Sequence, residues 1–213
     1  MTRIKDKSLY LVLSKEYEGD EDFLKVAETA VSAGIDVLQM REKGLPREGL
    51  IELGNILSLI CVRGGVTFIV NDDPEIAKEV NADGVHLGQE DLKKWPLHKV
   101  RSILEKNKII GISTHSLRQF TEAEASDCDY IAFGPIFGTK TKDYSIGTCD
   151  IEKIAASSKK PVVFIGGIDL ENVGAVTRRG GKNIAVIRSI MHADDVEETV
   201  KAFKAKLNGN SRS

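Results

Sequence analysis

Short apolar runs alternate with longer amphipathic stretches about eight times along this chain of 213 residues. The short runs are mostly continuous in their apolar character, as expected for strands that are buried on both faces of a parallel sheet. The longer stretches repeat apolar residues at helical spacing, for example at Phe23, Val26 and Ala27. The runs that we interpret as strands are 9–13, 36–40, 67–70, 84–87, 109–112, 130–133, 161–165 and 184–187.

This alternation predicts an α/β fold, for which two architectures compete. An open doubly wound sheet of the dinucleotide-binding kind carries a G-x-G-x-x-G loop after its first strand, and residues 14–17 contain no glycine. Polar and charged clusters instead follow many of the strands around the whole chain, as a barrel with its site at one mouth requires. We therefore expect a single (β/α)8 TIM barrel domain over residues 1–207, followed by a polar tail over 208–213.

Composition narrows the classes of function. A net charge of −2 offers no basic field for the phosphate backbone, so no nucleic-acid partner is expected. The three cysteines form no C-x-x-C pair, which argues against a disulfide framework or a zinc site. Apolar runs are too short for a signal peptide or a membrane span, so we expect a cytoplasmic protein without a membrane partner. The oligomeric state is left open, a homo-oligomer included.

Two cations follow the second predicted strand. If the segment stays extended, Arg41 and Lys43 lie on the same side as Gln39, because residues in a strand alternate between faces. Together they could hold a phosphate or a pyrophosphate, arginine through its planar fork and lysine as a point charge. The alternative is a solvated charge cluster that is paired internally through Glu42.

Carboxylates follow the third and fourth predicted strands. Asp73 precedes a proline and is expected to cap a helix, which leaves Asn71 and Asp72 at the barrel mouth. Asp91 or Glu90 would place a second carboxylate one strand away from Asp72. Carboxylates from adjacent loops, completed by water and substrate phosphates, suit magnesium. Alternatively, Asp91 only caps the next helix.

Further polar groups follow the later strands. Ser113 could hydrogen-bond a substrate, and His86 is expected to fill the barrel wall or to orient a neighbour. The loop after the sixth strand holds two hydroxyls and two cations in residues 139–142, a pattern typical of a phosphate cradle and lid. Gly166 and Gly167 follow the seventh strand, and in these barrels the loops after strands seven and eight commonly bind phosphate through backbone N–H groups.

Five of these segments, taken in order, resemble the thiamine phosphate synthase family; they are 39–43, 71–72, 83–91, 134–142 and 166–168. The resemblance implies a barrel enzyme that joins a hydroxymethylpyrimidine diphosphate to a thiazole phosphate, its two small-molecule substrates, and releases pyrophosphate. It implies that the pyrimidine diphosphate is held by Gln39, Arg41, Lys43, Asn71, Ser113 and Lys142. It further implies magnesium at Asp72 and Asp91, and a thiazole phosphate site made of Thr139, Thr141, Gly167, Ile187 and Arg188. Arg41, Lys43 and Lys142 would assist the departure of pyrophosphate.

One position departs from the family pattern. Where a serine commonly follows the last strand, this chain has Arg188, with Ser189 behind it, so either side chain could contact the thiazole phosphate. Two alternatives to the synthase remain. A related barrel that tautomerises a thiazole carboxylate phosphate would use His115 as an acid-base group and need no metal, and a non-catalytic barrel would only bind a phosphorylated ligand.

Overall fold

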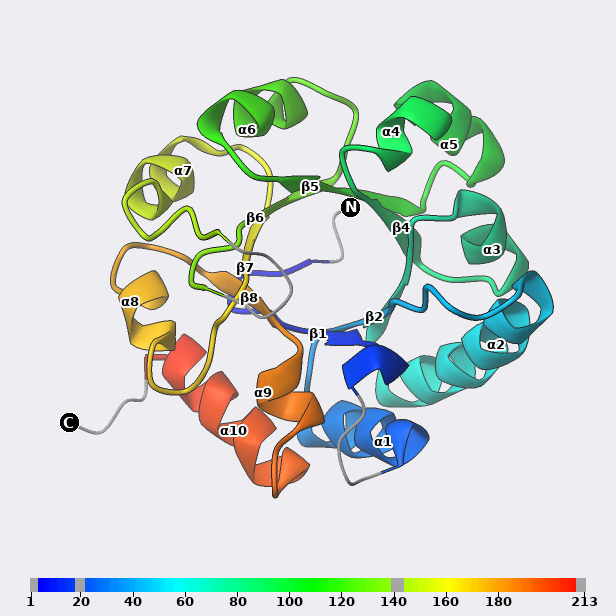
Figure 1. Ribbon diagram of the computed structural model, residues 1–213, viewed down its shortest axis with the longest axis horizontal. Helices are drawn as coiled ribbons and strands as arrows, with labels where there is room; N and C mark the ends of the chain where they lie inside the picture. The colour runs from blue at the N-terminus through cyan, green and yellow to red at the C-terminus, as the bar shows by residue number, and fades with distance from the viewer. Residues whose placement is uncertain (1–3, 18–21, 139–143, 210–213) are drawn as a thin grey trace.

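The computed structural model describes residues 4–17, 22–138 and 144–209. Its eight parallel strands close into a barrel in which each strand pairs with its neighbour in the sequence and the last pairs with the first (Figure 1). The predicted (β/α)8 TIM barrel is therefore confirmed. The strands are β1 (Leu9–Leu13), β2 (Val37–Met40), β3 (Thr67–Asn71), β4 (Gly84–Leu87), β5 (Ile109–Thr114), β6 (Tyr130–Phe133), β7 (Val162–Ile165) and β8 (Asn183–Val186).

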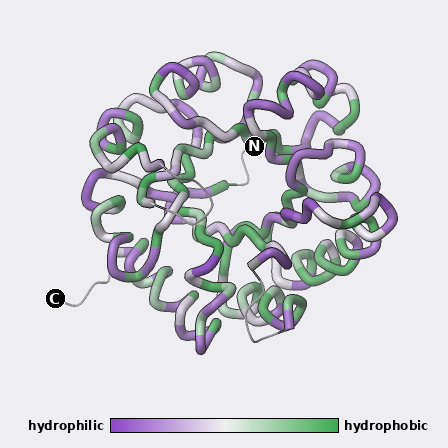
Figure 2. The backbone as a smooth tube through the Cα atoms, in the orientation of Figure 1, coloured by the Kyte–Doolittle hydropathy of each residue, from purple (hydrophilic) through white to green (hydrophobic). Residues whose placement is uncertain are grey.

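Helices surround the barrel on all sides (Figure 1), and Figure 2 shows the mixed hydropathy that lets each helix face both the strands and the solvent. They are η1 (Lys15–Tyr17), α1 (Phe23–Ala33), α2 (Arg47–Gly64), α3 (Pro74–Glu79), α4 (Asp91–Lys94), α5 (Leu97–Ile103), α6 (Leu117–Glu124), α7 (Ile151–Ser157), α8 (Val173–Thr177), α9 (Arg188–Met191) and α10 (Val196–Leu207).

Local chemistry sets where several helices begin. Asp73 accepts hydrogen bonds from the N–H groups of the first turn of α3, which confirms its predicted capping role. Ser116 caps α6 in the same way. Asp22 caps α1, and that helix ends where Gly34 takes a left-handed conformation at φ 102°. These caps fix the points at which the chain leaves each strand's loop and turns outward.

The largest shift from the predicted strands lies at β5 and β8. β5 continues to Thr114, two residues beyond the predicted end, because Ser113 and Thr114 pair with Ala132 and Phe133 of β6. β8 begins and ends one residue earlier than predicted, since Ile187 precedes the first turn of α9. Its first residue, Asn183, is buried and hydrogen-bonded to β7 and to the start of β1.

Two separate apolar cores hold the fold together. The larger lies between the strands and the surrounding helices, and the smaller fills the inside of the barrel. The inner core includes Tyr10 of β1 and Tyr130 of β6, whose hydroxyls bring polar groups into this interior. Among the described residues, none of the helices is long and apolar enough to span a membrane.

Candidate active site

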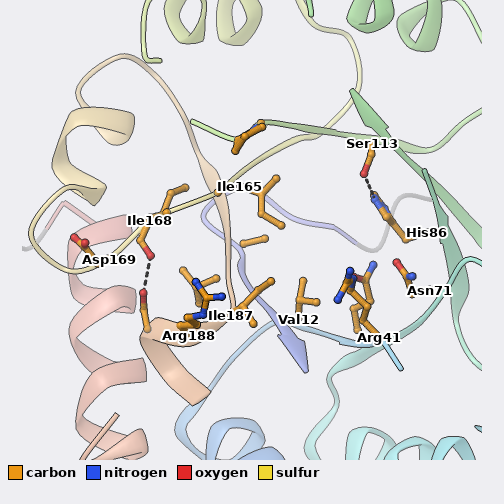
Figure 3. Close-up of a pocket in the computed structure, with 18 of the residues that line it drawn as sticks. Val12, Arg41, Asn71, His86, Ser113, Ile165, Ile168, Asp169, Ile187 and Arg188 are labelled. Atoms are coloured by element: carbon orange, nitrogen blue, oxygen red, sulfur yellow. Dashed lines mark hydrogen bonds between the residues drawn. The ribbon is translucent and has the colours of Figure 1, made fainter. Parts of the chain in front are cut away.

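A cavity of about 450 Å³ opens where the loops leave the carboxyl ends of the strands. Figure 3 shows its two sides, with Arg41, Asn71, His86 and Ser113 facing Ile168, Ile187 and Arg188. The carboxyl end of the strands is where barrels of this kind hold their sites. Predicted site residues that line it are Gln39, Arg41, Asn71, Ser113, Gly167, Ile187 and Arg188.

The segment after β2 is only partly as predicted. Gln39 and Arg41 both line the cavity, as alternation requires. The strand ends at Met40, however, so the alternation does not extend to Lys43, which is exposed and absent from the lining. Lys43 nevertheless lies close enough to Asp72 to lower the pKa of that carboxyl.

Arg41 is paired, but not through the residue expected in the alternative interpretation. Its guanidinium donates to the Glu16 carboxylate at 3.3 Å. The Glu42 carboxylate instead accepts from the backbone N–H of Lys15, the first residue of η1. Burial raises the pKa of Glu42 above its usual value, and the hydrogen bond from Lys15 opposes that rise. Arg41 and Glu42 thus make their hydrogen bonds to the segment after β1, at Glu16 and Lys15, and not to each other.

The backbone at Asp72 has an unusual conformation that the sequence did not reveal. Its φ is 67°, in the left-handed region that residues other than glycine rarely adopt. The N–H of Asp72 donates to the His86 carbonyl at 2.8 Å, and the N–H of Asp73 donates to the Asn71 carbonyl at 2.9 Å. This tight turn directly follows the carboxyl end of β3, although neither Asp72 nor Asp91 is among the residues that line the cavity. Such local strain is common at functional sites.

Asp72 meets the carboxylate of Asp91. Burial, followed by the contact with Asp91, raises the pKa of Asp72 to about 7, although Lys43 and Arg41 act in the opposite direction. Asp91 is the first residue of α4 and not its cap, and its Oδ2 accepts from the N–H of Gly88 at 2.8 Å. The other candidate, Glu90, is exposed and paired with Lys93. Asp91 is therefore the partner of Asp72.

This carboxylate pair fits a magnesium ion. Two acidic groups in contact repel one another when both are charged, and both this contact and burial raise the pKa of Asp72 against the effect of Lys43 and Arg41. A divalent cation between them would cancel that repulsion. Within the described ranges no cluster of three or more metal-ligating side chains occurs. Magnesium does not need one, because it commonly uses one or two carboxylates and takes its other ligands from water and substrate phosphates.

The opposite side of the cavity exposes backbone at two glycines. Gly166 and Gly167 follow β7 with φ values of 105° and 62°. A Cβ on Gly167 would lie 2.6 Å from the carbonyl oxygen of Gly138, and one on Gly166 would lie 2.4 Å from the Cα of Pro135. Only glycine fits both the conformation and the space. The seventh strand's loop therefore brings bare backbone to the cavity.

Arg188 and Ser189 open the short helix α9 beside these glycines. Both residues line the cavity and are half-buried. The Ser189 hydroxyl donates to the Ile168 carbonyl at 2.6 Å, which ties α9 to the loop after β7 (Figure 3). The first N–H groups of a helix have no partner within that helix, so they are available to an anion.

Three predicted residues, Thr139, Thr141 and Lys142, lie outside the described part of the chain. Residues on both sides of this segment are placed: Gly138 lines the cavity, and Ile146 donates its N–H to the Pro135 carbonyl.

Sequence reasoning missed two tyrosines next to the site. Tyr10 and Tyr130 meet inside the barrel at 2.9 Å between their hydroxyls, and Tyr130 also contacts His86. Burial keeps the pKa of both phenols above its usual value and lowers the pKa of His86 to about 4. The signal was available, because each tyrosine occupies an apolar strand where a hydroxyl needs a buried partner. His86 is buried in the barrel wall, one of its two predicted roles, and contacts both Tyr130 and Ser113.

Comparison with known proteins places the chain among one group of enzymes. Residues 9–190 match the family described as thiamine monophosphate synthase. The thiamine-phosphate synthase of Halalkalibacterium halodurans is 37% identical over 207 residues, which covers 96% of this chain and 97% of that one. That of Pelotomaculum thermopropionicum is 38% identical over 209 residues, covering 95% and 93%. The solved thiamine phosphate pyrophosphorylase of Pyrococcus furiosus is 32% identical, with a TM-score of 0.85 and coverage of 95% and 96%.

Proposed function

The chain belongs to the thiamine monophosphate synthase family, and on that premise we propose that it condenses a hydroxymethylpyrimidine diphosphate with a thiazole phosphate. The products are thiamine monophosphate and pyrophosphate. The observation that carries this proposal is the Asp72–Asp91 pair, which lies next to Arg41 and Lys43. Acids beside cations suit a magnesium diphosphate, in which the metal meets the carboxylates and the remaining phosphate charge meets the cations.

Asp72 and Asp91 would hold the magnesium ion, which when bound neutralises charge that builds up on the departing pyrophosphate. Gln39, Asn71 and Ser113 line the same side and would orient the pyrimidine diphosphate. Arg41 and Lys43, with Lys142 from beyond the described residues, would hold the diphosphate and stabilise it as it leaves.

The reaction needs little acid-base chemistry from the protein. An aminopyrimidine stabilises a benzylic-type cation, so the C–O bond to pyrophosphate breaks first and takes its electron pair to the leaving group. The thiazole nitrogen then supplies the pair for the new C–N bond. The chain's tasks are to hold both reactants close together and to stabilise the departing anion.

The second substrate would occupy the side of β7 and β8. The glycine backbone at Gly167 and the first turn of α9, with Ile187 and Arg188, would receive the phosphate of the thiazole. Thr139 and Thr141 would add their hydroxyls. The two substrates then face each other across one cavity, with the thiazole nitrogen toward the pyrimidine methylene.

The direct test supplies the purified protein with both substrates, once with magnesium and once with excess EDTA. Thiamine monophosphate and pyrophosphate should appear together and only with the metal. Folded protein that makes neither product would refute the synthase. The same protein would then be offered a thiazole carboxylate phosphate, because His115 lines the cavity and is the acid-base group of the tautomerase alternative.

A further inference from the structure

A continuous line of hydrogen-bonded side chains crosses the inside of the barrel and reaches the cavity at both of its ends. We call it the interior relay; its members are Gln39, Tyr10, Tyr130, His86 and Ser113. The contacts in that order are 3.0 Å from Gln39 Nε2 to Tyr10 Oη, 2.9 Å between the two phenol oxygens, 2.7 Å from Tyr130 Oη to His86 Nδ1, and 2.8 Å from His86 Nε2 to Ser113 Oγ. The last contact is drawn in Figure 3.

The barrel is shaped around this line. Gly111 of β5 pairs in register with both His86 and Tyr130. A Cβ at Gly111 would lie 2.1 Å from the Tyr130 Cζ and 2.5 Å from its hydroxyl oxygen. The missing side chain is therefore what lets the Tyr130 phenol pass across β5 to His86. Both tyrosines are buried, so each hydroxyl depends on these partners.

The chemistry of the groups gives the relay one direction. The Gln39 amide nitrogen can only donate, so Tyr10 accepts from it. The single proton of Tyr10 then goes to Tyr130, and that of Tyr130 goes to His86 Nδ1. With the opposite direction, the Tyr10 proton would face the amide N–H of Gln39.

The consequences appear at the two ends. His86, which accepts at Nδ1, carries its proton on Nε2 and donates it to Ser113 Oγ. The proton of the Ser113 hydroxyl is then directed into the cavity that this residue lines. At the other end, the N–H side of the Gln39 amide is turned to Tyr10, which leaves its carbonyl oxygen as an acceptor for a ligand.

We propose that Tyr10, Tyr130 and His86 are positioning residues that set Ser113 as a hydrogen-bond donor, and Gln39 as an acceptor, toward the bound pyrimidine substrate. The inference rests on the proposed function, because it takes the pyrimidine diphosphate to be the ligand on this side. The three residues do not touch the reacting atoms in this account. They act by fixing which hydrogen bonds Ser113 and Gln39 can offer.

The first test needs neither substrate nor turnover. Nitrogen NMR of the histidine-labelled protein reports which ring nitrogen of each neutral histidine carries the proton, and the signal missing from His86→Gln identifies His86. We expect the proton on Nε2. A proton on Nδ1 would reverse the relay and overturn the proposal, whatever the result of the synthase assay.

The second test is a double-mutant cycle in the steady state. Tyr130→Phe should raise the KM for the pyrimidine diphosphate about tenfold, equivalent to about 1.4 kcal/mol, and leave the KM for the thiazole phosphate unchanged. Ser113→Ala should have a similar effect. If the relay acts through Ser113, the double variant should be no worse than Ser113→Ala alone. Fully additive losses would contradict the relay.

Thr114→Val is the matched control. Thr114 lies next to Ser113 on β5, is fully buried, and donates to the Ala132 carbonyl at 2.9 Å outside the relay. Its loss should lower Tm about as much as Tyr130→Phe does and change neither KM. A rise in the KM for the pyrimidine diphosphate in this control would assign the effect to a loosened barrel and overturn the proposal. Tyr10→Phe repeats the cycle if Tyr130→Phe does not fold.

Discussion

The two sides of the cavity are built by different means (Figure 3). On the side of β2 to β5, the polar groups are side chains, and other side chains hold them in place: Glu16 pairs with Arg41, and His86 contacts Ser113. On the side of β7 and β8, the cavity is formed by the backbone of Gly166 and Gly167 and by the first turn of α9. The first side relies on polar and charged side chains alone, whereas the second combines bare glycine backbone with the side chains of Arg188 and Ser189.

The difference determines how each side should respond to mutation. A charged side chain can be replaced by a neutral one of equal size, which removes its chemistry and leaves the fold intact. A glycine that is required by its backbone conformation and by close neighbours cannot be replaced without moving the chain. We therefore expect function and stability to separate on the first side and to fall together on the second.

The largest effect is expected for Asp72→Asn. Asparagine keeps the size of the side chain and tolerates the left-handed backbone, so the fold should persist. Turnover with magnesium should fall about a thousandfold, because the ion that neutralises the leaving group loses one of its two carboxylates. Steady-state assays and thermal unfolding measure the two quantities.

The matched control is Asp73→Ser at the next residue. Asp73 only caps α3, and serine can cap in its place. Its turnover should remain close to that of the unmodified protein. Equal losses in the two variants would mean that the loop, and not the carboxylate, is what matters.

Next in size is Gly167→Ala on the backbone side. An added Cβ meets the Gly138 carbonyl oxygen at 2.6 Å and disfavours the φ of 62°. We expect a loss of about 1–3 kcal/mol in the free energy of unfolding and a KM for the thiazole phosphate raised about tenfold. Gly65→Ala is the control, because it has a similar φ of 67° but nothing within 4 Å of its added Cβ. It should lose stability only.

The same difference explains what could be predicted from the sequence. The strands and the polar side chains that follow them were visible, because buried parallel strands are continuously apolar and Gln39, Arg41 and Asn71 break that pattern at their ends. The left-handed turn at Asp72 was not visible, since an aspartate gives no sign of it. Lys43 was misplaced because alternation was extended past the end of β2.

Contacts between residues far apart in the chain were the other feature that the sequence did not reveal. The interior relay joins residues that are up to 120 positions apart, such as Tyr10 and Tyr130. A single sequence does not show which inward-facing residues meet across a closed barrel. Gly111 could have indicated such a contact, because a glycine inside a strand often marks the close approach of another group.

A third prediction concerns pH on the charged side. Without metal, Asp72 holds its proton up to about pH 7, and magnesium competes with that proton. The apparent Kd for magnesium should therefore rise about tenfold per pH unit below about 7 and level off above it. Calorimetric titration with magnesium over this range measures it. A Kd that does not change with pH would separate Asp72 from the metal.

The Asp72 carboxyl also makes the stability of the metal-free protein depend on pH, in a direction that follows from its pKa. Because the folded pKa of about 7 exceeds the ordinary aspartate pKa of 3.8, the folded state binds more protons between these two limits. The contribution of Asp72 to stability is present below about pH 4 and is lost as the pH rises through about 7. The Tm of Asp72→Asn should therefore increase relative to that of the unmodified protein as the pH rises from about 4 to about 7.

The smallest effect is expected at Ser189, and it distinguishes this residue from Arg188. The Ser189 hydroxyl already donates to the Ile168 carbonyl, so Ser189→Ala should lose about 1 kcal/mol of stability and raise the KM for the thiazole phosphate only about twofold. Arg188→Met should raise that KM about tenfold if its guanidinium meets the phosphate. The reverse order would assign the phosphate contact to Ser189.

The most direct test of the central claim, that the two sides hold different substrates, is calorimetric titration of Asp72→Asn with magnesium pyrophosphate and, separately, with the thiazole phosphate. We expect the first ligand to bind at least about a hundredfold more weakly than to the unmodified protein and the second to bind with unchanged Kd. Equal weakening of both would contradict the division of the cavity into two sides, and unchanged binding of magnesium pyrophosphate would remove Asp72 from its site.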